Sequence, residues 1–140
     1  GDLRFRRLAH LKGMGADLVV LDGTRALPFA RRFQRILVDA PCSGTGTLGR
    51  NPEIKWRLAP SDLEDFPRRQ AALLANGRTA LAPGGLLVYS TCSLEPEENE
   101  RVVASVPPEL VVEVMRRIPG RDPGDGFYAA VIKSEQPAND

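Results

Sequence analysis

Two cysteines follow two short apolar runs, and they are the only thiols in the chain. Cys42 comes shortly after residues 35–39 and Cys92 shortly after residues 86–89, and both runs have the length and composition of β-strands. Because the carboxyl ends of parallel strands meet at one edge of an α/β sheet, both thiols are expected at one crevice. The pair therefore predicts a reaction centre with two sulfur atoms.

Two other roles compete for these cysteines. Free cysteines are often buried as small hydrophobic side chains, but both stand here among serine, threonine, glycine and proline, beyond the apolar runs. A disulfide between Cys42 and Cys92 is the second alternative, although a single pair of thiols without marks of a secreted scaffold fits a reducing compartment better. A free thiol with a pKa of about 8.5 is only a few per cent thiolate at neutral pH, so a nucleophilic cysteine needs a neighbouring group that stabilises its thiolate. A helix predicted to begin near Pro96 would direct its positive end toward Cys92.

Carboxylates end two of the predicted strands at the same edge of the sheet. Asp22 closes a β-rich run at residues 17–22, and Asp39 closes the run at residues 35–39. Either side chain can bind a polar ligand or cap a turn, and the sequence leaves both roles open.

Three other classes of site are disfavoured. Gly44-x-Gly46-x-x-Gly49 has the spacing of a dinucleotide fingerprint, but the irregular residues 50–52 do not open a helix, so a nucleotide-dependent oxidoreductase is a weak alternative. These glycines are expected instead to let a backbone loop approach closely. Metal binding and hydrolase chemistry are weak because His10 is the only histidine, lies on a predicted exposed helix face, and no Cys-x-x-Cys spacing exists.

The only tryptophan, Trp56, lies between Lys55 and Arg57 in a predicted loop. A packed tryptophan flanked by solvated charges is the favoured interpretation. Stacking on a nucleic-acid base, with the cations on phosphates, is the alternative.

The elements that must position these residues alternate between helices and strands. Hydrophobic spacing, a capping-box pattern and proline or glycine stops predict a helix at 3–12, strands at 17–22 and 35–39, a long helix from Ser61 to Leu81 stopped by residues 83–85, a strand at 86–89, a helix from Pro96 to 106, and strands at 110–115 and 127–133. The last two strands are expected to form an antiparallel pair, and the residues from Glu135 onward are expected to fray. The pattern predicts an α/β fold.

Length and composition limit the classes of protein further. The chain has 140 residues, 42% of them hydrophobic, which suits one core, so residues 1–140 are expected to form a single domain. Its 19 basic and 18 acidic side chains give a net charge of +1, which by itself indicates neither a nucleic-acid nor a membrane partner. No apolar run reaches membrane length and no signal-peptide pattern is found, so the cytoplasm is the default compartment.

Longer sequence blocks surround both cysteines and continue toward the end of the chain. They are Asp39-Ala40-Pro41-Cys42-Ser43-Gly44-Thr45-Gly46, Asn51-Pro52-x-x-Lys55-Trp56-Arg57, Tyr89-Ser90-Thr91-Cys92-Ser93, Pro96-Glu97-Glu98-Asn99-Glu100 and Asp125-Gly126-Phe127-Tyr128-Ala129-Ala130. Together, over essentially the whole chain, they resemble the Sun (Fmu) family of RNA cytosine-5 methyltransferases. The resemblance implies a Rossmann-like fold that uses S-adenosylmethionine, and an RNA substrate, most simply ribosomal RNA.

The resemblance also implies roles for individual residues. Cys92 would be the nucleophile that attacks carbon 6 of cytosine, and Cys42 would assist release of the covalent intermediate. Asp39 would hold the base edge and lie near the cofactor, with Asp22 near the adenine and Asp2 on the ribose hydroxyls. A covalent thiol adduct suits this reaction, because it divides one hard step into easier ones.

Further substrate contacts are expected next to the first thiol. Pro41, Lys55 and Arg57 would contact the RNA. The target base must leave its stack to reach the thiols.

One part of the family pattern has no counterpart in these residues. The family's glycine-rich cofactor loop, of the type Asp-x-Cys-Ala-Ala-Pro-Gly-Gly-Lys, would precede Asp2, which implies a fold truncated at its amino terminus with the first two strands absent. We therefore expect a partial catalytic domain with weak or absent cofactor binding. In the family strand order, 3-2-1-4-5-7-6, the strands at 17–22 and 35–39 would lose their neighbours, so they are predicted to pair directly or to form a homodimer. A catalytically silent RNA-binding or assembly module is the alternative function.

Overall fold

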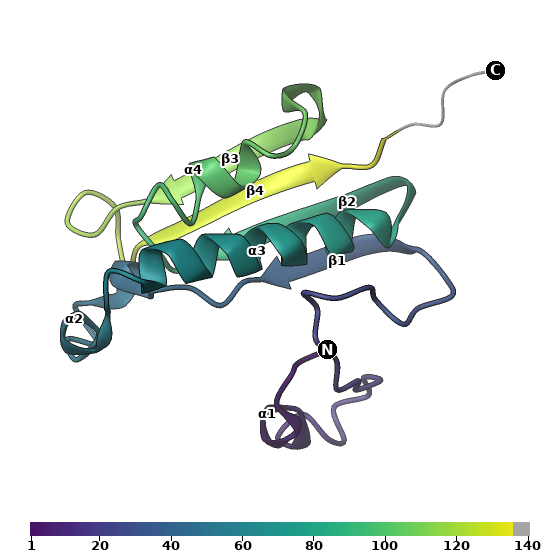
Figure 1. Ribbon diagram of the computed structural model, residues 1–140, viewed down its shortest axis with the longest axis horizontal. Coiled ribbons are helices and arrows are strands. Elements are labelled where there is room, and N and C mark those ends of the chain that lie inside the picture. The colour runs from purple at the N-terminus through teal and green to yellow at the C-terminus, as the bar shows by residue number, and fades with distance from the viewer. Residues whose placement is uncertain (136–140) are drawn as a thin grey trace.

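A four-stranded sheet forms the centre of the computed structural model, which describes residues 1–135 (Figure 1). Its strands, in the spatial order β1-β2-β4-β3, are β1 (Phe33–Asp39), β2 (Leu81–Thr91), β3 (Val111–Arg117) and β4 (Phe127–Lys133). β1 and β2 are parallel, whereas β4 is antiparallel to both β2 and β3. This is the order 4-5-7-6 of the expected sheet, so the predicted α/β methyltransferase fold class is confirmed.

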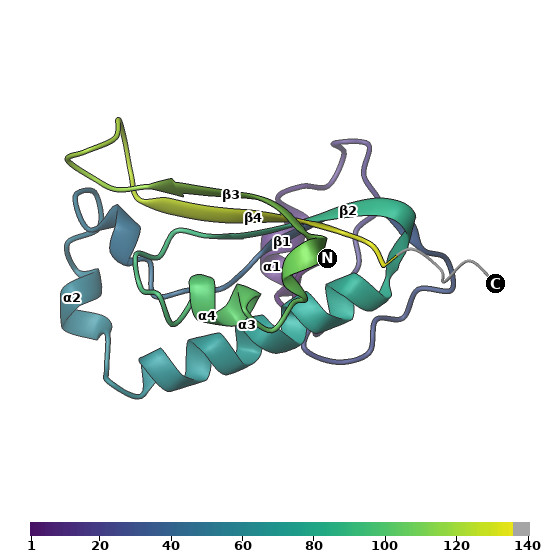
Figure 2. The same cartoon turned by 90° about the horizontal axis from the view of Figure 1, so that it is seen from above.

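One long helix and one short helix cover one face of this sheet (Figure 2). Short helices α1 (Phe5–Ala9), α2 (Ile54–Arg57) and α4 (Glu100–Val103) accompany one long helix, α3 (Asp62–Thr79), and two single 3₁₀ turns, η1 (Thr45–Thr47) and η2 (Pro108–Leu110). α3 connects β1 to β2 and lies with α4 on the same side of the sheet (Figure 2). None of the helices within residues 1–135 is both long enough and apolar enough to cross a membrane.

The core lies between α3, α4 and the sheet. Leu74 of α3 packs with Leu87 and Tyr89 of β2 and with Ile132 of β4, and all four are almost completely buried. Gly77 lets α3 come close, because a Cβ atom there would lie 2.8 Å from a methyl group of Leu87.

The opposite face of the sheet is less covered. On β1, Ile36 and Val38 pack against the core, whereas Leu37 between them is 69% exposed. Side chains alternate along a strand, so Leu37 marks the face that the helices leave open.

The amino-terminal segment differs from the prediction. The helix expected at 3–12 is limited to α1, and no strand forms at 17–22, where one isolated bridge joins Asp2 to Val20. The prediction that residues 17–22 pair directly with β1 is therefore wrong. A strand needs a continuous neighbour, and these residues find only Asp2, while residues 1–32 lie beside the sheet rather than in it (Figure 1).

Two further boundaries are corrected. Residues 83–85 were expected to end a helix before a strand, but they lie inside β2 as an irregularity where the pairing jumps from Phe33–Leu81 to Arg35–Leu86. Gly84 absorbs this irregularity with a φ of +69°, a conformation that glycine adopts at little cost.

The helix predicted from Pro96 to 106 is shorter than expected. Residues 96–99 form turns and α4 begins only at Glu100, because Asn99 has non-helical backbone angles. The dipole of this four-residue helix therefore does not explain the reactivity of Cys92.

The remaining predictions agree with the structure to within a few residues. The long helix, the strand at 35–39 and the antiparallel pair at 110–115 and 127–133 are confirmed. The capping box is not formed, since Ser61 makes no side-chain cap and Asp62 accepts the N–H of Ala59 instead. Of the residues expected to fray, 136–140 lie outside the described residues.

Candidate catalytic site at the carboxyl ends of β1 and β2

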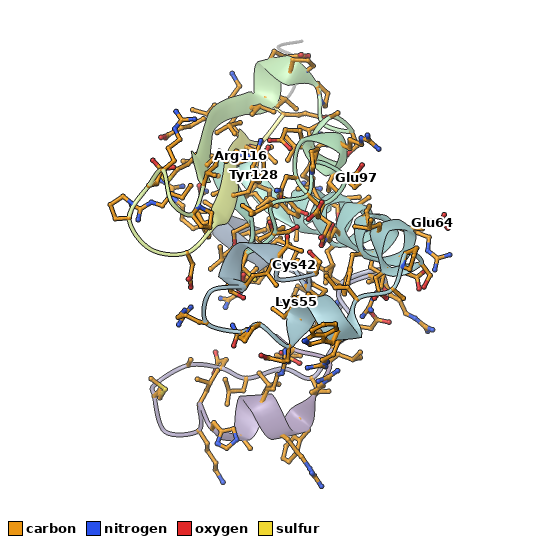
Figure 3. The ribbon with its side chains drawn as sticks, turned by 90° about the vertical axis from the view of Figure 1, so that its left-hand side faces the viewer. Cys42, Lys55, Glu64, Glu97, Arg116 and Tyr128 are labelled. Atoms are coloured by element: carbon orange, nitrogen blue, oxygen red, sulfur yellow. The ribbon has the colours of Figure 1, made fainter. Side chains whose placement is uncertain are left out.

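The structure brings the two thiols together. The loop after β1 and the loop after β2 place the sulfur atoms of Cys42 and Cys92 3.2 Å apart, both partly exposed and both as free thiols. A disulfide bond requires about 2.05 Å, so this is a reduced, hydrogen-bonded pair. Figure 3 looks onto this end of the molecule, with Cys42 near the centre of the view.

The two thiols differ in their affinity for the proton. The pKa of Cys92 is lowered to about 7, mainly because the Cys42 thiol donates a hydrogen bond to its sulfur and also because its own backbone N–H does so, against the effects of burial, Asp39 and Glu98. The pKa of Cys42 is raised by the same hydrogen bond, by burial and by the charge of Cys92. Cys92 therefore carries more thiolate at neutral pH than an ordinary cysteine, with Cys42 as its protonated donor.

Glycines allow the loops to approach each other. The N–H of Gly46 donates to the carbonyl of Cys92 at 2.9 Å, and the N–H of Gly126 donates to the carbonyl of Gly46 at 2.7 Å. A Cβ atom at Gly46 would lie 2.5 Å from the Gly126 carbonyl oxygen and 2.7 Å from that of Cys92. Of the three fingerprint-like glycines, Gly46 serves the close backbone approach that was predicted, whereas Gly49 has nothing within 4 Å of its Cβ position.

A buried polar network beneath the thiols was not predicted. Ser43 and Ser93 come directly after the two cysteines, and their hydroxyl oxygens lie 3.0 Å apart. Both residues also donate to the carboxylate of the completely buried Glu98, Ser43 through its backbone N–H and Ser93 through its hydroxyl. The sequence held one signal, because both serines and Glu98 belong to the blocks around the thiols, but nothing in the sequence showed which acidic residue points inward.

The predicted carboxylates fall into two places. Asp39 is exposed at the end of β1, where its carboxylate accepts a hydrogen bond from the Ser90 hydroxyl at 3.3 Å. Asp2 and Asp22 lie in the amino-terminal segment, where the N–H of Leu21 donates to the carbonyl of Asp2 at 3.1 Å. The structure therefore places the backbone of Asp2 beside residues 20–21, just before Asp22, and leaves Asp39 with the thiols.

Asp22 borders a hollow of about 300 Å³. Hydrogen bonds from the hydroxyl and N–H of Thr24, at 2.6 and 3.0 Å, lower the pKa of Asp22, with smaller contributions from Arg25 and Arg69. The hollow is lined by Leu3, Asp22, Thr24, Arg68, Arg69 and Ala72. A carboxylate held ionised beside a small hollow can accept hydrogen bonds from ligand hydroxyl and amino groups.

The predicted RNA-contacting residues lie on and before α2. Lys55 and Arg57 are exposed on this helix, and the favoured interpretation of a packed tryptophan is wrong, since Trp56 is 82% exposed. The Lys55 ammonium lies 5.5 Å from the centre of the Trp56 ring. Pro41 is exposed too, and its carbonyl accepts a hydrogen bond from the Gln70 side chain at 2.8 Å. In the view of Figure 3, Lys55 lies below Cys42.

No metal centre is found in the part of the chain that the structure describes, where no group of three or more His, Cys, Asp or Glu side chains is arranged to hold an ion. His10 is exposed at the end of α1.

The fold and the known relatives together define the class of protein. The order β1-β2-β4-β3, with functional loops after the parallel strands, makes the chain part of a Rossmann-like methyltransferase domain. The crystal structure of NSun6 from Pyrococcus horikoshii with SFG covers 94% of this chain and 38% of that chain with a TM-score of 0.78 and 27% identity. The crystal structure of PH0851 covers 95% of this chain and 35% of that chain, with a TM-score of 0.79 and 31% identity.

Sequence relatives narrow the class to one family. The family model described as 16S rRNA methyltransferase RsmB/F matches residues 4–109, and the chain belongs to this family. Ribosomal RNA small subunit methyltransferase B of Salmonella arizonae is 37% identical, over 89% of this chain and 33% of the relative. The same enzyme of Klebsiella pneumoniae is 36% identical, over 89% and 32%. The chain thus spans about a third of the length of the curated relatives it matches.

Proposed function

We propose that this chain carries the thiol-bearing part of the active site of a ribosomal RNA cytosine carbon-5 methyltransferase that acts in the cytoplasm through a covalent cysteine adduct. The observation that carries the proposal is the thiol pair, with a 3.2 Å sulfur–sulfur contact and the pKa of Cys92 lowered to about 7. A nucleophile with a pKa near the working pH combines a large thiolate fraction with good nucleophilicity. Membership of the RsmB/F family supports ribosomal RNA as the substrate.

The first step is addition of the Cys92 thiolate to carbon 6 of the target cytosine. A sulfur–carbon bond forms, and the electron pair of the C5–C6 double bond moves toward carbon 5, which becomes nucleophilic. S-adenosylmethionine, when bound, supplies the methyl group that carbon 5 takes. Carbon 5 then carries both the methyl group and its original hydrogen.

The second step is release, and here Cys42 acts. Once Cys92 is bonded to carbon, its sulfur is neutral, so the charge and hydrogen bond that raised the pKa of Cys42 are gone. Cys42 can then lose its proton to solvent and, as thiolate, remove the hydrogen from carbon 5. The C5–C6 double bond reforms, the sulfur–carbon bond breaks, and Cys92 leaves as thiolate with Cys42 again protonated.

The surroundings of the thiols suit a flipped base of an RNA strand. Asp39, exposed beside the pair, presents a carboxylate that accepts a hydrogen bond from the exocyclic amine of cytosine. Lys55 and Arg57 provide cations for backbone phosphates, and the exposed ring of Trp56 provides a stacking surface. Pro41 contributes exposed backbone next to Cys42.

The cofactor is S-adenosylmethionine, and the described residues offer hydrogen-bond acceptors for its ribose and adenine groups. Carboxylates accept hydrogen bonds from ribose hydroxyls and from the adenine amino group, which suits Asp2, Asp22 and the hollow beside Asp22. The structure of the relative NSun6 with SFG, an analogue of S-adenosylmethionine, supports this choice.

The test is covalent trapping. The chain is incubated with RNA containing 5-azacytidine, with and without S-adenosylmethionine, and separated on a denaturing gel. We expect a protein–RNA adduct that is lost in Cys92→Ser and kept in the matched control Cys42→Ser. An adduct that persists in Cys92→Ser contradicts the proposed nucleophile.

A second candidate function is favoured by one observation. The exposed Trp56 between two cations would serve equally well in a catalytically silent RNA-binding or assembly module. This module would bind RNA in a gel-shift assay and form no adduct, in the wild type as in Cys92→Ser.

A further inference from the structure

A buried carboxylate connects the two cysteine loops. Glu98 is 0% exposed, and none of the ion pairs within residues 1–135 includes it. Its Oε2 atom accepts hydrogen bonds from the backbone N–H of Ser43 at 2.9 Å and from Nε2 of Gln70 at 2.8 Å. Its Oε1 atom accepts one from the Ser93 hydroxyl at 2.7 Å. We call these four residues the Glu98 clamp, in which three donors replace water around a buried carboxylate.

Two of the donors stand next to the thiols. Ser43 follows Cys42 and Ser93 follows Cys92, so one carboxylate holds the residue beside each thiol. Movement of either loop away from the other would break a hydrogen bond to a buried carboxylate. Such a break is costly because it removes one of the three donors that stabilise the buried charge. The Glu98 clamp therefore resists separation of the two sulfur atoms.

The clamp is itself fixed to the core. The hydroxyl of Tyr89, a fully buried residue of β2, donates to the backbone carbonyl of Glu98 at 2.6 Å. The Gln70 amide donates to the carbonyl of Pro41 as well as to Glu98, so it ties α3 to the Cys42 loop. Strand, helix and turn thus hold the carboxylate in one place.

We propose that Glu98 is a positioning residue that holds Cys42 within hydrogen-bond distance of Cys92 and so keeps Cys92 ready as the nucleophile. The inference rests on the proposed function for its catalytic meaning, but its physical content concerns the free protein. The fully buried side chain of Glu98 reaches the loops through its hydrogen bonds to Ser43 and Ser93, and this contact, rather than its charge, carries the positioning role.

The direction in which the pKa of Cys92 moves distinguishes a positioning role of Glu98 from an effect of its charge alone. The groups that act on Cys92 are Cys42, through its hydrogen bond, and Asp39 and Glu98, through their charges. The negative charge of Glu98 raises the pKa of Cys92, whereas the hydrogen bond from Cys42 lowers it. Loss of the charge alone would therefore move the pKa of Cys92 down, and loss of the Cys42 contact would move it up.

The experiment measures the rate of Cys92 alkylation by iodoacetamide against pH, with peptide mass spectrometry to separate Cys92 from Cys42. In Glu98→Gln, a neutral amide accepts hydrogen bonds from Ser43 and Ser93 less strongly than the carboxylate does, so the hold on both loops weakens and the loops should part. We expect the midpoint to rise from about 7 toward the ordinary thiol value of about 8.5. The matched control Glu97→Gln, which removes a neighbouring carboxylate paired with Arg101 at the surface, should leave the midpoint unchanged.

Folding is checked by cooperative thermal unfolding of each variant. A folded Glu98→Gln protein whose midpoint stays near 7 or falls overturns the proposal. If Glu98→Gln does not fold, Ser93→Ala decides, because it removes one donor with little change in volume; a smaller upward shift supports the clamp and an unchanged midpoint overturns it. No RNA or cofactor is used, so failure of the clamp and failure of the methyltransferase proposal are separate outcomes.

Discussion

The two cysteine loops have the same sequence plan and opposite properties. In each, a strand ends and a cysteine is followed by a serine, yet the pKa of Cys92 is lowered to about 7 and that of Cys42 is raised. The chain after Cys92 turns inward to the buried Glu98, whereas the chain after Cys42 continues outward to α2 and the exposed Trp56. Similar local sequences thus receive different environments from the segments that continue them, in agreement with the proposal that Cys92 is the nucleophile and that the Cys42 loop serves proton transfer and substrate contact.

The largest expected effect comes from removing Cys42. If Cys42 removes the hydrogen from carbon 5, then Cys42→Ala should stop release but not attack. With ordinary cytosine RNA and S-adenosylmethionine, a stable adduct should accumulate on a denaturing gel, where the wild type shows little. If Cys42→Ala forms no adduct, as expected for Cys92→Ser, the proposed division between Cys92 as nucleophile and Cys42 in release is contradicted.

The second prediction concerns the proton of Cys92. Its pKa is lowered chiefly by the hydrogen bond from Cys42, so Cys42→Ala should raise the midpoint of Cys92 alkylation from about 7 toward about 8.5. The thiolate present at pH 7 would fall by about tenfold. Cys42→Ser keeps a hydroxyl donor and should shift the midpoint less. A midpoint near 7 in Cys42→Ala would mean that the backbone alone lowers this pKa.

The third prediction concerns the outward side of the Cys42 loop. Base stacking on an exposed aromatic ring contributes about 1–3 kcal/mol, so Trp56→Ala should weaken RNA binding by roughly 5- to 150-fold. Thermal unfolding should hardly change, because Trp56 is 82% exposed. The matched control Leu48→Ala removes another partly exposed apolar side chain and should leave RNA affinity nearly unchanged. Equal RNA affinities of the wild type and Trp56→Ala would contradict the prediction that this loop contacts the substrate.

The fourth prediction tests the close backbone contact at Gly46 between the loops. Gly46→Ala places a methyl group against two carbonyl oxygens and should lower the free energy of unfolding by about 1–3 kcal/mol. Gly49→Ala is the control, since a Cβ atom there meets nothing within 4 Å. Urea unfolding measures both. The same stability for the two variants would show that the loops have room to separate.

The smallest expected effect is self-association. β1 pairs with β2 on one side only, and its other edge has no ladder in residues 1–135. Pairing through that edge should give a weak dimer, seen as a concentration-dependent sedimentation coefficient. Leu37→Lys, on the open face of β1, should weaken it further. A strictly monomeric wild type at high concentration would contradict this prediction.

Much of the sheet and the meeting of the thiols could be predicted from the sequence. The apolar runs around 36–38 and 86–89 are too short for helices, and the long helix between them requires a parallel crossover, which brings Cys42 and Cys92 to one edge. The antiparallel pair β3–β4 was predictable from a connection without a helix.

The failures have physical causes that lie outside local sequence. Residues 17–22 have β-propensity, but a strand depends on its neighbour, and only Asp2 is available. Trp56 was expected to pack because most tryptophans do, and only the tertiary structure showed it 82% exposed. Glu98 points inward because residues 96–99 form a non-helical turn. The sequence predicted a helix there instead, because acidic residues that follow a proline are typical of the first turn of a helix.

The sulfur atoms that meet at 3.2 Å are 50 residues apart in the chain. In an unfolded ensemble the closure of so long a loop is entropically unfavourable, so the contact exists only after the β1-α3-β2 crossover has folded. A chain in which this crossover has not folded lacks the Cys42 hydrogen bond that lowers the pKa of Cys92, and it exposes an ordinary, weakly reactive thiol. The reactivity of Cys92 thus depends on the tertiary structure of the crossover.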